Sequence, residues 1–318
     1  MKPPQQPQPP TPTTRPAPLG PFTTLRGGGG GALAAGSTSG PVMSLHNTGA
    51  TWWTGDAPAT ISFENAGPVN GSVWIDGGKR LRVGLGTIDL AAKSFTIEPA
   101  LQPFVKDAAR LAGIAWFPDG SRVALLMNGP ALRVDQRPPA GYDRTKRELV
   151  IVTLGGTDQP IRHGITIAGT PVIAAGDERV VVGGKTTQLF DGRGEPLDVA
   201  FTALPEFVAR ASYSAGRFVL VGSDGKVTLL DARSGATIAT WGGEGIVDAA
   251  ATGTTIVTVG SDATVHVGCL AGSTVTEVAK ASAGSAATLV QLVGDRVVVS
   301  ADGPDPIRVA SLAAPCTP

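Results

Sequence analysis

Side chains able to do chemistry are few and scattered in this chain of 318 residues. The three histidines, His46, His163 and His266, belong to no H-E-x-x-H motif and have no second histidine at metal-ligand spacing. The chain contains no G-x-S-x-G elbow and no P-loop, since the glycine run 27–31 is not followed by lysine. The sequence therefore predicts no catalytic residue, no metal site and no cofactor, and we expect a protein that is not an enzyme.

Aspartates recur in turns flanked by glycine or serine. A carboxylate in such a turn can accept a hydrogen bond from its own downstream backbone N–H, which stabilises the turn without a ligand. Calcium would require several oxygens converging on one loop in a D-x-D-x-D-G pattern, which this chain lacks. We interpret these residues as structural: Asp119, Asp224, Asp262 and Asp302.

The elements that would have to position any site repeat from about residue 70 onward. A glycine turn returns at intervals of 42, 56, 40, 37 and 41 residues, by subtraction of its positions. The turns are Gly78, Gly120, Gly176, Gly216, Gly253 and Gly294. After each turn comes a run nearly continuous in Val and Leu, which is typical of a strand covered on both faces. These runs are Leu81–Gly84, Val123–Met127, Val180–Gly183, Phe218–Gly222, Ile256–Gly260 and Val297–Ser300.

A further strand follows each run. These strands are Thr87–Leu90, Leu149–Thr153, Thr187–Asp191, Val227–Asp231, Val265–Cys269 and Ile307–Ala310. Helical periodicity is confined to two short segments, Phe104–Leu111 and Glu206–Arg210. A unit of about 40 residues built from four strands is the signature of a β-propeller blade. The sequence therefore predicts an all-β protein of this architecture.

Two of the units resemble known propeller families. The segment Phe218–Trp241 resembles a WD40-like repeat, with Leu230-Asp231 in the place of the Trp-Asp pair and Ser234-Gly235 at the hairpin turn. The segment Ile114–Leu126 resembles the repeats of the bacterial TolB-like propellers, with a Phe-Pro-Asp-Gly turn. The resemblance extends over residues 70–312 and implies a propeller fold.

Six blades are evident, and residues 20–69 predict a seventh. Ala32–Ser37 and Val42–His46 match a second and a third strand, although a six-bladed ring remains the alternative. The last blade lacks a fourth strand after Ala310. Phe22–Leu25 could supply it and close the ring, which would remove exposed sheet edges, or it could be the first strand of blade one.

The N-terminal residues differ in composition from the rest of the chain. Residues 1–19 are rich in proline, which predicts a disordered arm, either a ligand for aromatic grooves or a spacer, in front of a propeller domain at 20–318. The 26 basic and 26 acidic residues balance, which excludes an electrostatic nucleic-acid partner. With no signal peptide and no long apolar run, we expect no membrane insertion and a cytoplasmic location.

The two cysteines, Cys269 and Cys316, leave that location open. They are either ordinary thiols or one disulfide. A disulfide would fit a periplasmic or extracellular protein whose signal has been removed, since disulfides persist mainly in oxidising compartments.

Two features are candidates for binding a partner. The first is a basic insertion, RPPAGYDRTKR, because arginine and tyrosine are favoured at interfaces; the alternative is a solvated hairpin. Its candidate residues are Arg137, Tyr142, Arg144, Lys146 and Arg147. The second is Trp52-Trp53, where neighbours on a strand point to opposite faces, so that one ring would be exposed. Alternatively, one ring packs between blades and the other under the proline-rich arm.

These observations support two hypotheses. The first is a non-catalytic propeller that binds another protein as a scaffold, either as a monomer or as part of a hetero-complex. The second is an exported propeller that binds a small ligand or glycan, with or without hydrolysing it.

Overall fold

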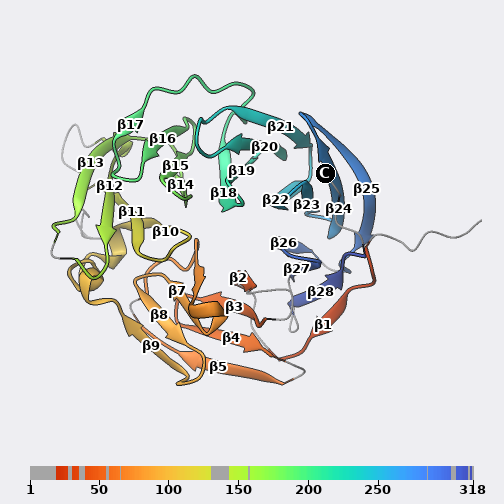
Figure 1. The fold of residues 1–318 in the computed structure, drawn as a ribbon, viewed down its shortest axis with the longest axis horizontal. Coiled ribbons are helices and arrows are strands. Elements are labelled where there is room, and N and C mark those ends of the chain that lie inside the picture. The colour runs from red at the N-terminus through yellow and green to blue at the C-terminus, as the bar shows by residue number, and fades with distance from the viewer. Residues whose placement is uncertain are drawn as a thin grey trace, which may run out of the picture.

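The protein is a ring of seven four-stranded antiparallel sheets, each forming one blade (Figure 1). The computed structural model describes residues 19–27, 31–35, 40–54, 57–64, 66–129, 143–156, 158–284, 286–301, 306–313 and 316. The predicted seven-bladed propeller is therefore confirmed. Apart from residue 19, the predicted N-terminal arm lies outside the described residues. No helix in the described ranges is long and apolar enough to span a membrane.

Strands follow one another from the centre of the ring to its outer rim in the first four blades. Blade 1 comprises β2 (Ala32–Ala35), β3 (Val42–His46), β4 (Gly49–Trp53) and β5 (Pro58–Ser62). Blade 2 comprises β6 (Val73–Ile75), β7 (Arg80–Val83), β8 (Gly86–Asp89) and β9 (Ser94–Ile97). Blade 3 comprises β10 (Leu111–Trp116), β11 (Arg122–Asn128), β12 (Lys146–Thr153) and β13 (Ile161–Thr166). Blade 4 comprises β14 (Val172–Ala175), β15 (Arg179–Gly183), β16 (Gln188–Asp191) and β17 (Pro196–Leu197).

The remaining three blades repeat this order until the last strand. Blade 5 comprises β18 (Val208–Ser214), β19 (Arg217–Gly222), β20 (Lys226–Asp231) and β21 (Thr237–Gly242). Blade 6 comprises β22 (Ile246–Thr252), β23 (Thr255–Gly260), β24 (Thr264–Ala271) and β25 (Thr274–Ser282). Blade 7 comprises β26 (Ala287–Val293), β27 (Arg296–Ala301), β28 (Ile307–Ser311) and, from the other end of the chain, β1 (Thr23–Leu25).

The described helices are short and lie between blades 2 and 3 or within blade 2. They are α1 (Gln102–Val105) and the 3-10 turns Asp76–Gly78, Pro99–Leu101 and Ala108–Arg110. The prediction of a helix near Phe104–Leu111 is partly confirmed. The prediction at Glu206–Arg210 is wrong, because Val208 already pairs with Gly222 as the first residue of β18.

The second strand of each blade supplies most of the core. In β19 and β23 every residue from the second onward is buried, because neighbouring blades cover both faces of the sheet. Side chains that point to opposite faces consequently enter different clusters: Val219 packs against blade 6, and Leu220 packs against blade 4. The Val-rich runs found in the sequence are therefore the inter-blade core.

The order of strands in blade 1 differs from the sequence-based prediction. Ala32–Ala35 and Val42–His46 are the first and second strands, not the second and third. The additional strand is β4, whose residues Gly49–Trp53 pair with both β3 and β5. Blade 1 is thus complete without Phe22–Leu25.

The ring is closed by the two ends of the chain. Thr23, Thr24 and Leu25 pair with Val309, Arg308 and Ile307, respectively. An isolated bridge extends this pairing to Leu19 and Leu312, both buried. Of the two roles considered for Phe22–Leu25, the structure shows the fourth strand of the last blade.

A disulfide fastens the C-terminal end to blade 6. Cys269 and Cys316 are bonded, with their Cα atoms 5.4 Å apart. Around the bond, the Thr254 hydroxyl donates to the Cys316 carbonyl at 2.8 Å, and the Cys316 amide donates to the Thr255 hydroxyl at 3.0 Å. The structure therefore shows a disulfide where the sequence left two alternatives.

Removal of residues 1–25 should destabilise the ring, because it deletes β1 and the buried contacts of Leu19, Phe22 and Leu25. Burial of three apolar side chains corresponds to about 3 kcal/mol or more. We expect a lower midpoint in urea-induced unfolding and exposure of the β28 edge, measured by amide hydrogen exchange. Removal of residues 1–18 is the matched control, since it leaves β1 and Leu19 in place. Equal midpoints for the two truncated proteins would contradict closure by β1.

Candidate functional site: the central channel and a basic segment on the same face

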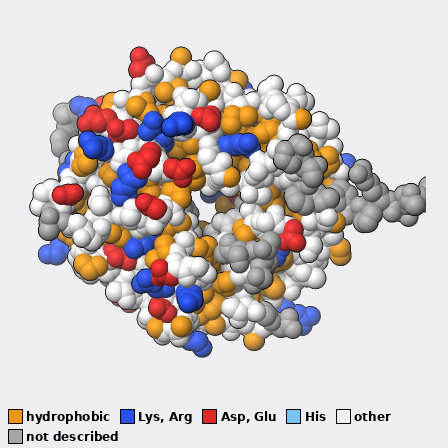
Figure 2. All heavy atoms as spheres, in the orientation of Figure 1, with side chains coloured by type: hydrophobic (Ala, Val, Ile, Leu, Met, Phe, Trp, Pro, Cys, Tyr) orange, Lys and Arg blue, Asp and Glu red, His pale blue; other side chains and the backbone are white. Residues whose placement is uncertain are grey.

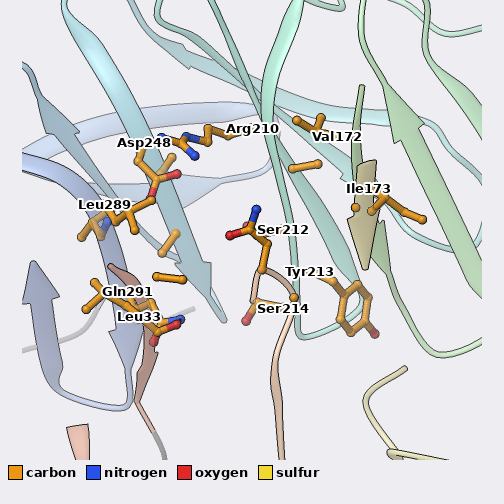
Figure 3. A pocket seen from close by; sticks show the side chains of 18 of the residues that line it. Leu33, Val172, Ile173, Arg210, Ser212, Tyr213, Ser214, Asp248, Leu289 and Gln291 are labelled. Carbon is orange, nitrogen blue, oxygen red and sulfur yellow. Dashed lines mark hydrogen bonds between the residues drawn. The ribbon is translucent and has the colours of Figure 1, made fainter. Parts of the chain in front are cut away.

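The inner strands of six blades, together with residues 69–71 before the inner strand of blade 2, line a central cavity of about 320 Å³ (Figure 3). Most of its lining is alanine, glycine, valine, leucine or isoleucine. Among the residues that line it, Arg210 and Asp248 alone are charged. Figure 2 shows the hollow at the centre of the ring, with charged side chains gathered over blades 2 to 4.

Arg210 and Asp248 occupy the same position in neighbouring blades. Arg210 in β18 pairs with Val221, and Asp248 in β22 pairs with Val259; in both strands the register shifts immediately before this residue. The corresponding residue of blade 7 is Leu289, which pairs with Ser300 after the same kind of shift. A β-bulge in each inner strand therefore places these side chains at one level of the channel wall.

The Asp248 carboxylate joins blade 6 to blade 7. Its Oδ2 accepts a hydrogen bond from the Val290 amide at 2.9 Å. Desolvation in the channel wall raises the pKa of Asp248 to about 6, although the Val290 N–H and the charge of Arg210 oppose this shift. Asp248 is consequently ionised at neutral pH at a cost to stability.

Arg210 is exposed to the channel. It lies beside Asp248 in Figure 3 and interacts with it electrostatically. Within the described ranges, however, its guanidinium has no carboxylate within 4.0 Å and no hydrogen-bond acceptor. Ser212, two residues further along β18, is also exposed to the cavity.

Gln291 forms a second bridge between inner strands. Its Oε1 accepts from the Ala35 amide and its Nε2 donates to the Leu33 carbonyl, both at 2.7 Å. The side-chain amide thus imitates a strand partner for β2 and connects blade 7 to blade 1.

The predicted basic insertion is described only at its end. Arg144 and Lys146 are exposed and Arg147 is half-buried, at the point where β12 begins. The Asp143 carboxylate accepts from the Thr145 amide at 2.9 Å and from its hydroxyl at 2.6 Å, which holds the turn in front of the strand. The other predicted residues, Arg137 and Tyr142, lie outside the described residues.

The basic segment and the charged pair of the channel lie on the same face of the ring. In blade 3, the first residue of the inner strand pairs near the end of β11, and the end of β11 pairs with the start of β12. Inner strands and third strands therefore begin on one face. Arg144 and Lys146 precede or begin a third strand, and Arg210 and Asp248 are the third residues of their inner strands.

The expectation of an exposed tryptophan ring at Trp52-Trp53 is wrong. Only 4% of Trp52 and 3% of Trp53 is exposed. Trp52 packs against blade 2, whereas Trp53 packs against blade 7 and donates from Nε1 to the Arg26 carbonyl at 3.0 Å. Neighbours on a strand do point to opposite faces, but both faces of β4 are covered by blades.

The recurring aspartates stabilise turns, as the sequence suggested. The Asp224 and Asp262 carboxylates accept from the Lys226 and Thr264 amides at 3.0 and 2.9 Å. The hydrogen bonds of Thr264 lower the pKa of Asp262. Asp119 accepts from the Ser121 amide in the same way, and Asp302 lies outside the described residues.

None of the three histidines is among the residues that line the channel. His266 Nδ1 lies 2.7 Å from Glu277 Oε2 on the outer part of blade 6, and His163 Nε2 lies 3.2 Å from the Arg193 carbonyl. In the part of the chain that the structure describes, no group of three or more His, Cys, Asp and Glu side chains is arranged to hold a metal ion.

The sequence analysis did not identify Arg210 and Asp248. Arg210 fell in the segment wrongly predicted as a helix, and Asp248 fell in an alanine-rich stretch that suggested no chemistry. A signal was present, because these residues lie six and five positions before the repeating turns at Gly216 and Gly253. Alignment of the repeats on those turns would have placed them one position apart, and the pairing with the second strands brings them to the same level.

Comparisons with known proteins identify the fold. No family model matches the chain, and no curated protein matches it. A chain of the mitotic checkpoint complex is similar in structure, with 12% identity, a TM-score of 0.65 and coverage of 99% of this chain and 97% of that one. U3-55K has 10% identity, a TM-score of 0.65 and coverage of 92% and 98%. The WD40 repeats of RRP9 have 11% identity, a TM-score of 0.65 and coverage of 92% and 97%.

The chain therefore shares the β-propeller fold with these structures. At such low identity the likeness shows the fold alone, because propellers of one architecture carry many functions.

Substitution Asp248→Asn should stabilise the protein at neutral pH. A carboxyl whose pKa rises from 3.8 to about 6 on folding contributes stability below pH 4 that is lost as the pH rises through 6. Asparagine can still accept from Val290 but carries no charge. Relative to wild type, we expect a gain of at most about 3 kcal/mol at pH 7.5 that vanishes near pH 4, measured by urea unfolding at both pH values. A gain that does not change with pH would contradict this assignment.

Proposed function

We propose that the protein is a non-catalytic propeller that binds another protein through the face on which the inner strands begin. The observation that carries this proposal is the exposed basic pair Arg144 and Lys146, held at the start of a rigid strand by the Asp143 turn. Exposed cations on an ordered framework favour a partner with an acidic surface and accelerate its association.

The fold supports this proposal at a general level. Similar propellers include a chain of the mitotic checkpoint complex, so a ring of this shape is found within a multiprotein assembly. A propeller framework is rigid because every blade packs against two others, and its surface connections can vary without disturbing the core.

The double substitution Arg144→Glu and Lys146→Glu should weaken the partner complex at least tenfold without changing the melting temperature. Both side chains are exposed, and their replacement changes the net charge at the proposed contact by four units. The partner is recovered by affinity purification from the native organism, identified, and titrated against each purified variant. The matched control is Arg193→Glu with Arg233→Glu, two exposed cations in turns between third and fourth strands on the opposite face. Equal affinities of the wild type, the double variant and the control variant for the partner would show that the basic segment is not part of the interface.

The disulfide supports a second proposal, that the protein works in an oxidising compartment. Cys269 and Cys316 are 47 residues apart and bonded. A structural disulfide persists mainly outside the reducing cytoplasm. This location is compatible with a protein partner, a glycan or a small ligand, and does not depend on the basic segment.

Reduction of the disulfide should lower the free energy of unfolding. Opening a loop of this length corresponds to about 4 kcal/mol in the chain-entropy model. We expect dithiothreitol to lower the melting temperature of the wild type and to leave a Cys269→Ser, Cys316→Ser variant unchanged. Mass spectrometry after alkylation of protein taken from its native compartment checks the location. Recovery of both thiols in alkylated form would contradict an oxidising compartment.

A further inference from the structure

Two opposite charges face the central cavity side by side without neutralising each other directly. Arg210 and Asp248 are at the same level of blades 5 and 6, and they are the charged members of an otherwise uncharged lining. Within the described part of the chain, their charged atoms are not within the 4.0 Å of an ion pair. The space next to them therefore presents one positive and one negative charge to a ligand.

This arrangement discriminates between ligands by charge. A simple anion attracted to Arg210 would be repelled by the neighbouring Asp248 carboxylate, and a simple cation attracted to Asp248 would be repelled by Arg210. A small zwitterion avoids both penalties, because its carboxylate faces the guanidinium while its ammonium faces the carboxylate. In an α-amino acid these two groups are attached to one carbon atom, which suits two receptor groups on adjacent strands.

The hydrogen-bonding capacity of the pair is also suitable. The Val290 amide donates to Oδ2 of Asp248, and the Ala249 N–H also interacts with this carboxylate, so that two backbone amides orient it. The five N–H donors of a guanidinium can bind a carboxylate in a bidentate manner. Exposed Ser212 adds a hydroxyl on the same face of β18 as Arg210, since they are two residues apart.

An apolar wall lies next to the charged pair. Leu289 occupies the level of Arg210 and Asp248 in blade 7 and lines the cavity, as do Val172 and Ile173 of blade 4 (Figure 3). A cavity of about 320 Å³ is at the lower end of the size of small-molecule sites. It is suited to an amino acid with an aliphatic or aromatic side chain.

The destabilising effect of the ionised Asp248 carboxylate also supports the presence of a ligand. An ionised carboxylate in the channel wall is destabilising, and the Val290 amide could be satisfied equally well by an uncharged acceptor. Groups that reduce stability are typical of binding sites, where a ligand compensates them. A ligand ammonium beside the Asp248 carboxylate would provide this compensation.

We propose that the central channel binds a zwitterionic ligand of the α-amino-acid class with an apolar side chain. Arg210 binds the carboxylate, Asp248 binds the ammonium, and Leu289 contacts the side chain. This site is separate from the basic segment and does not depend on a protein partner.

The full chain is titrated with L-leucine, L-valine and L-phenylalanine up to about 10 mM by calorimetry and by protein-observed NMR, since weak sites have dissociation constants near 1 mM. Two analogues of leucine separate the charges: 4-methylpentanoate lacks the ammonium, and 3-methylbutylamine lacks the carboxylate. We expect saturable binding of at least one amino acid, and at least tenfold weaker binding of both analogues. Absence of saturable binding by all three amino acids, or an analogue that binds as tightly as leucine, would overturn the proposal.

Variants assign the two roles. Arg210→Gln and Asp248→Asn should each weaken amino-acid binding at least tenfold, and Arg193→Gln, in an exposed turn away from the cavity, should not change it. Asp248→Asn is expected to be more stable than wild type, so a loss of binding cannot result from unfolding. Unchanged affinity in either channel variant would assign the bound amino acid to a different site and refute this one.

The pH dependence provides an independent test. The charged group that faces Asp248 from β18 is Arg210, and β26 contributes the uncharged residues Leu289, Val290 and Gln291. Between pH 7.5 and pH 5, protonation of Asp248 should weaken leucine binding about tenfold, and Asp248→Asn should abolish this dependence. Binding that becomes tighter at pH 5 would indicate a simple anion site instead.

Discussion

The pairing of β1 with β28 is the constraint on which the remainder of the ring depends. Each blade buries apolar residues on both of its faces, so no blade can be stable unless a neighbour covers each face. Six interfaces follow from the order of the chain, but the seventh requires its two ends to meet. Three residues of β1 and the Leu19–Leu312 bridge make that connection. Leu25 then packs with Trp53 and Val298 in a core shared by the first and last blades.

The difference in amino-acid composition between the strands of a blade follows from this packing. Second and third strands lie between neighbouring blades, and therefore must be rich in valine, leucine and isoleucine. First strands have one edge that faces the central axis. Side chains at this edge do not pack between two blades. A charged residue such as Arg210 can consequently be accommodated there without disturbing the core. The channel wall can therefore carry charged groups on a framework that the second and third strands hold in place.

This difference between the buried strands and the channel-lining strands explains how much could be predicted from the sequence. The repeating Val-rich strands and glycine turns are local patterns, and they predicted six of the seven blades, while residues 20–69 predicted the seventh. The position of Phe22–Leu25 was ambiguous, because a three-residue strand has no pattern strong enough to select its partner. The burial of Trp52 and Trp53 depends on which blades flank β4, which is a tertiary property. The charged pair of the channel was not predicted, since Arg210 and Asp248 meet only when the inner strands of blades 5 and 6 lie side by side.

Several side-chain contacts and a disulfide stabilise the part of the ring where the two ends of the chain meet. Asp248 connects blade 6 to blade 7, Gln291 connects blade 7 to blade 1, and the disulfide holds residue 316 against blade 6. Side chains and a covalent bond thus reinforce the sector that is closed by only a short strand. Asp248 belongs to this sector through its hydrogen bond with Val290, and it also lines the cavity. The same residue can therefore couple the state of the channel to the integrity of the ring, because a ligand that compensates its charge would also stabilise the contact with Val290.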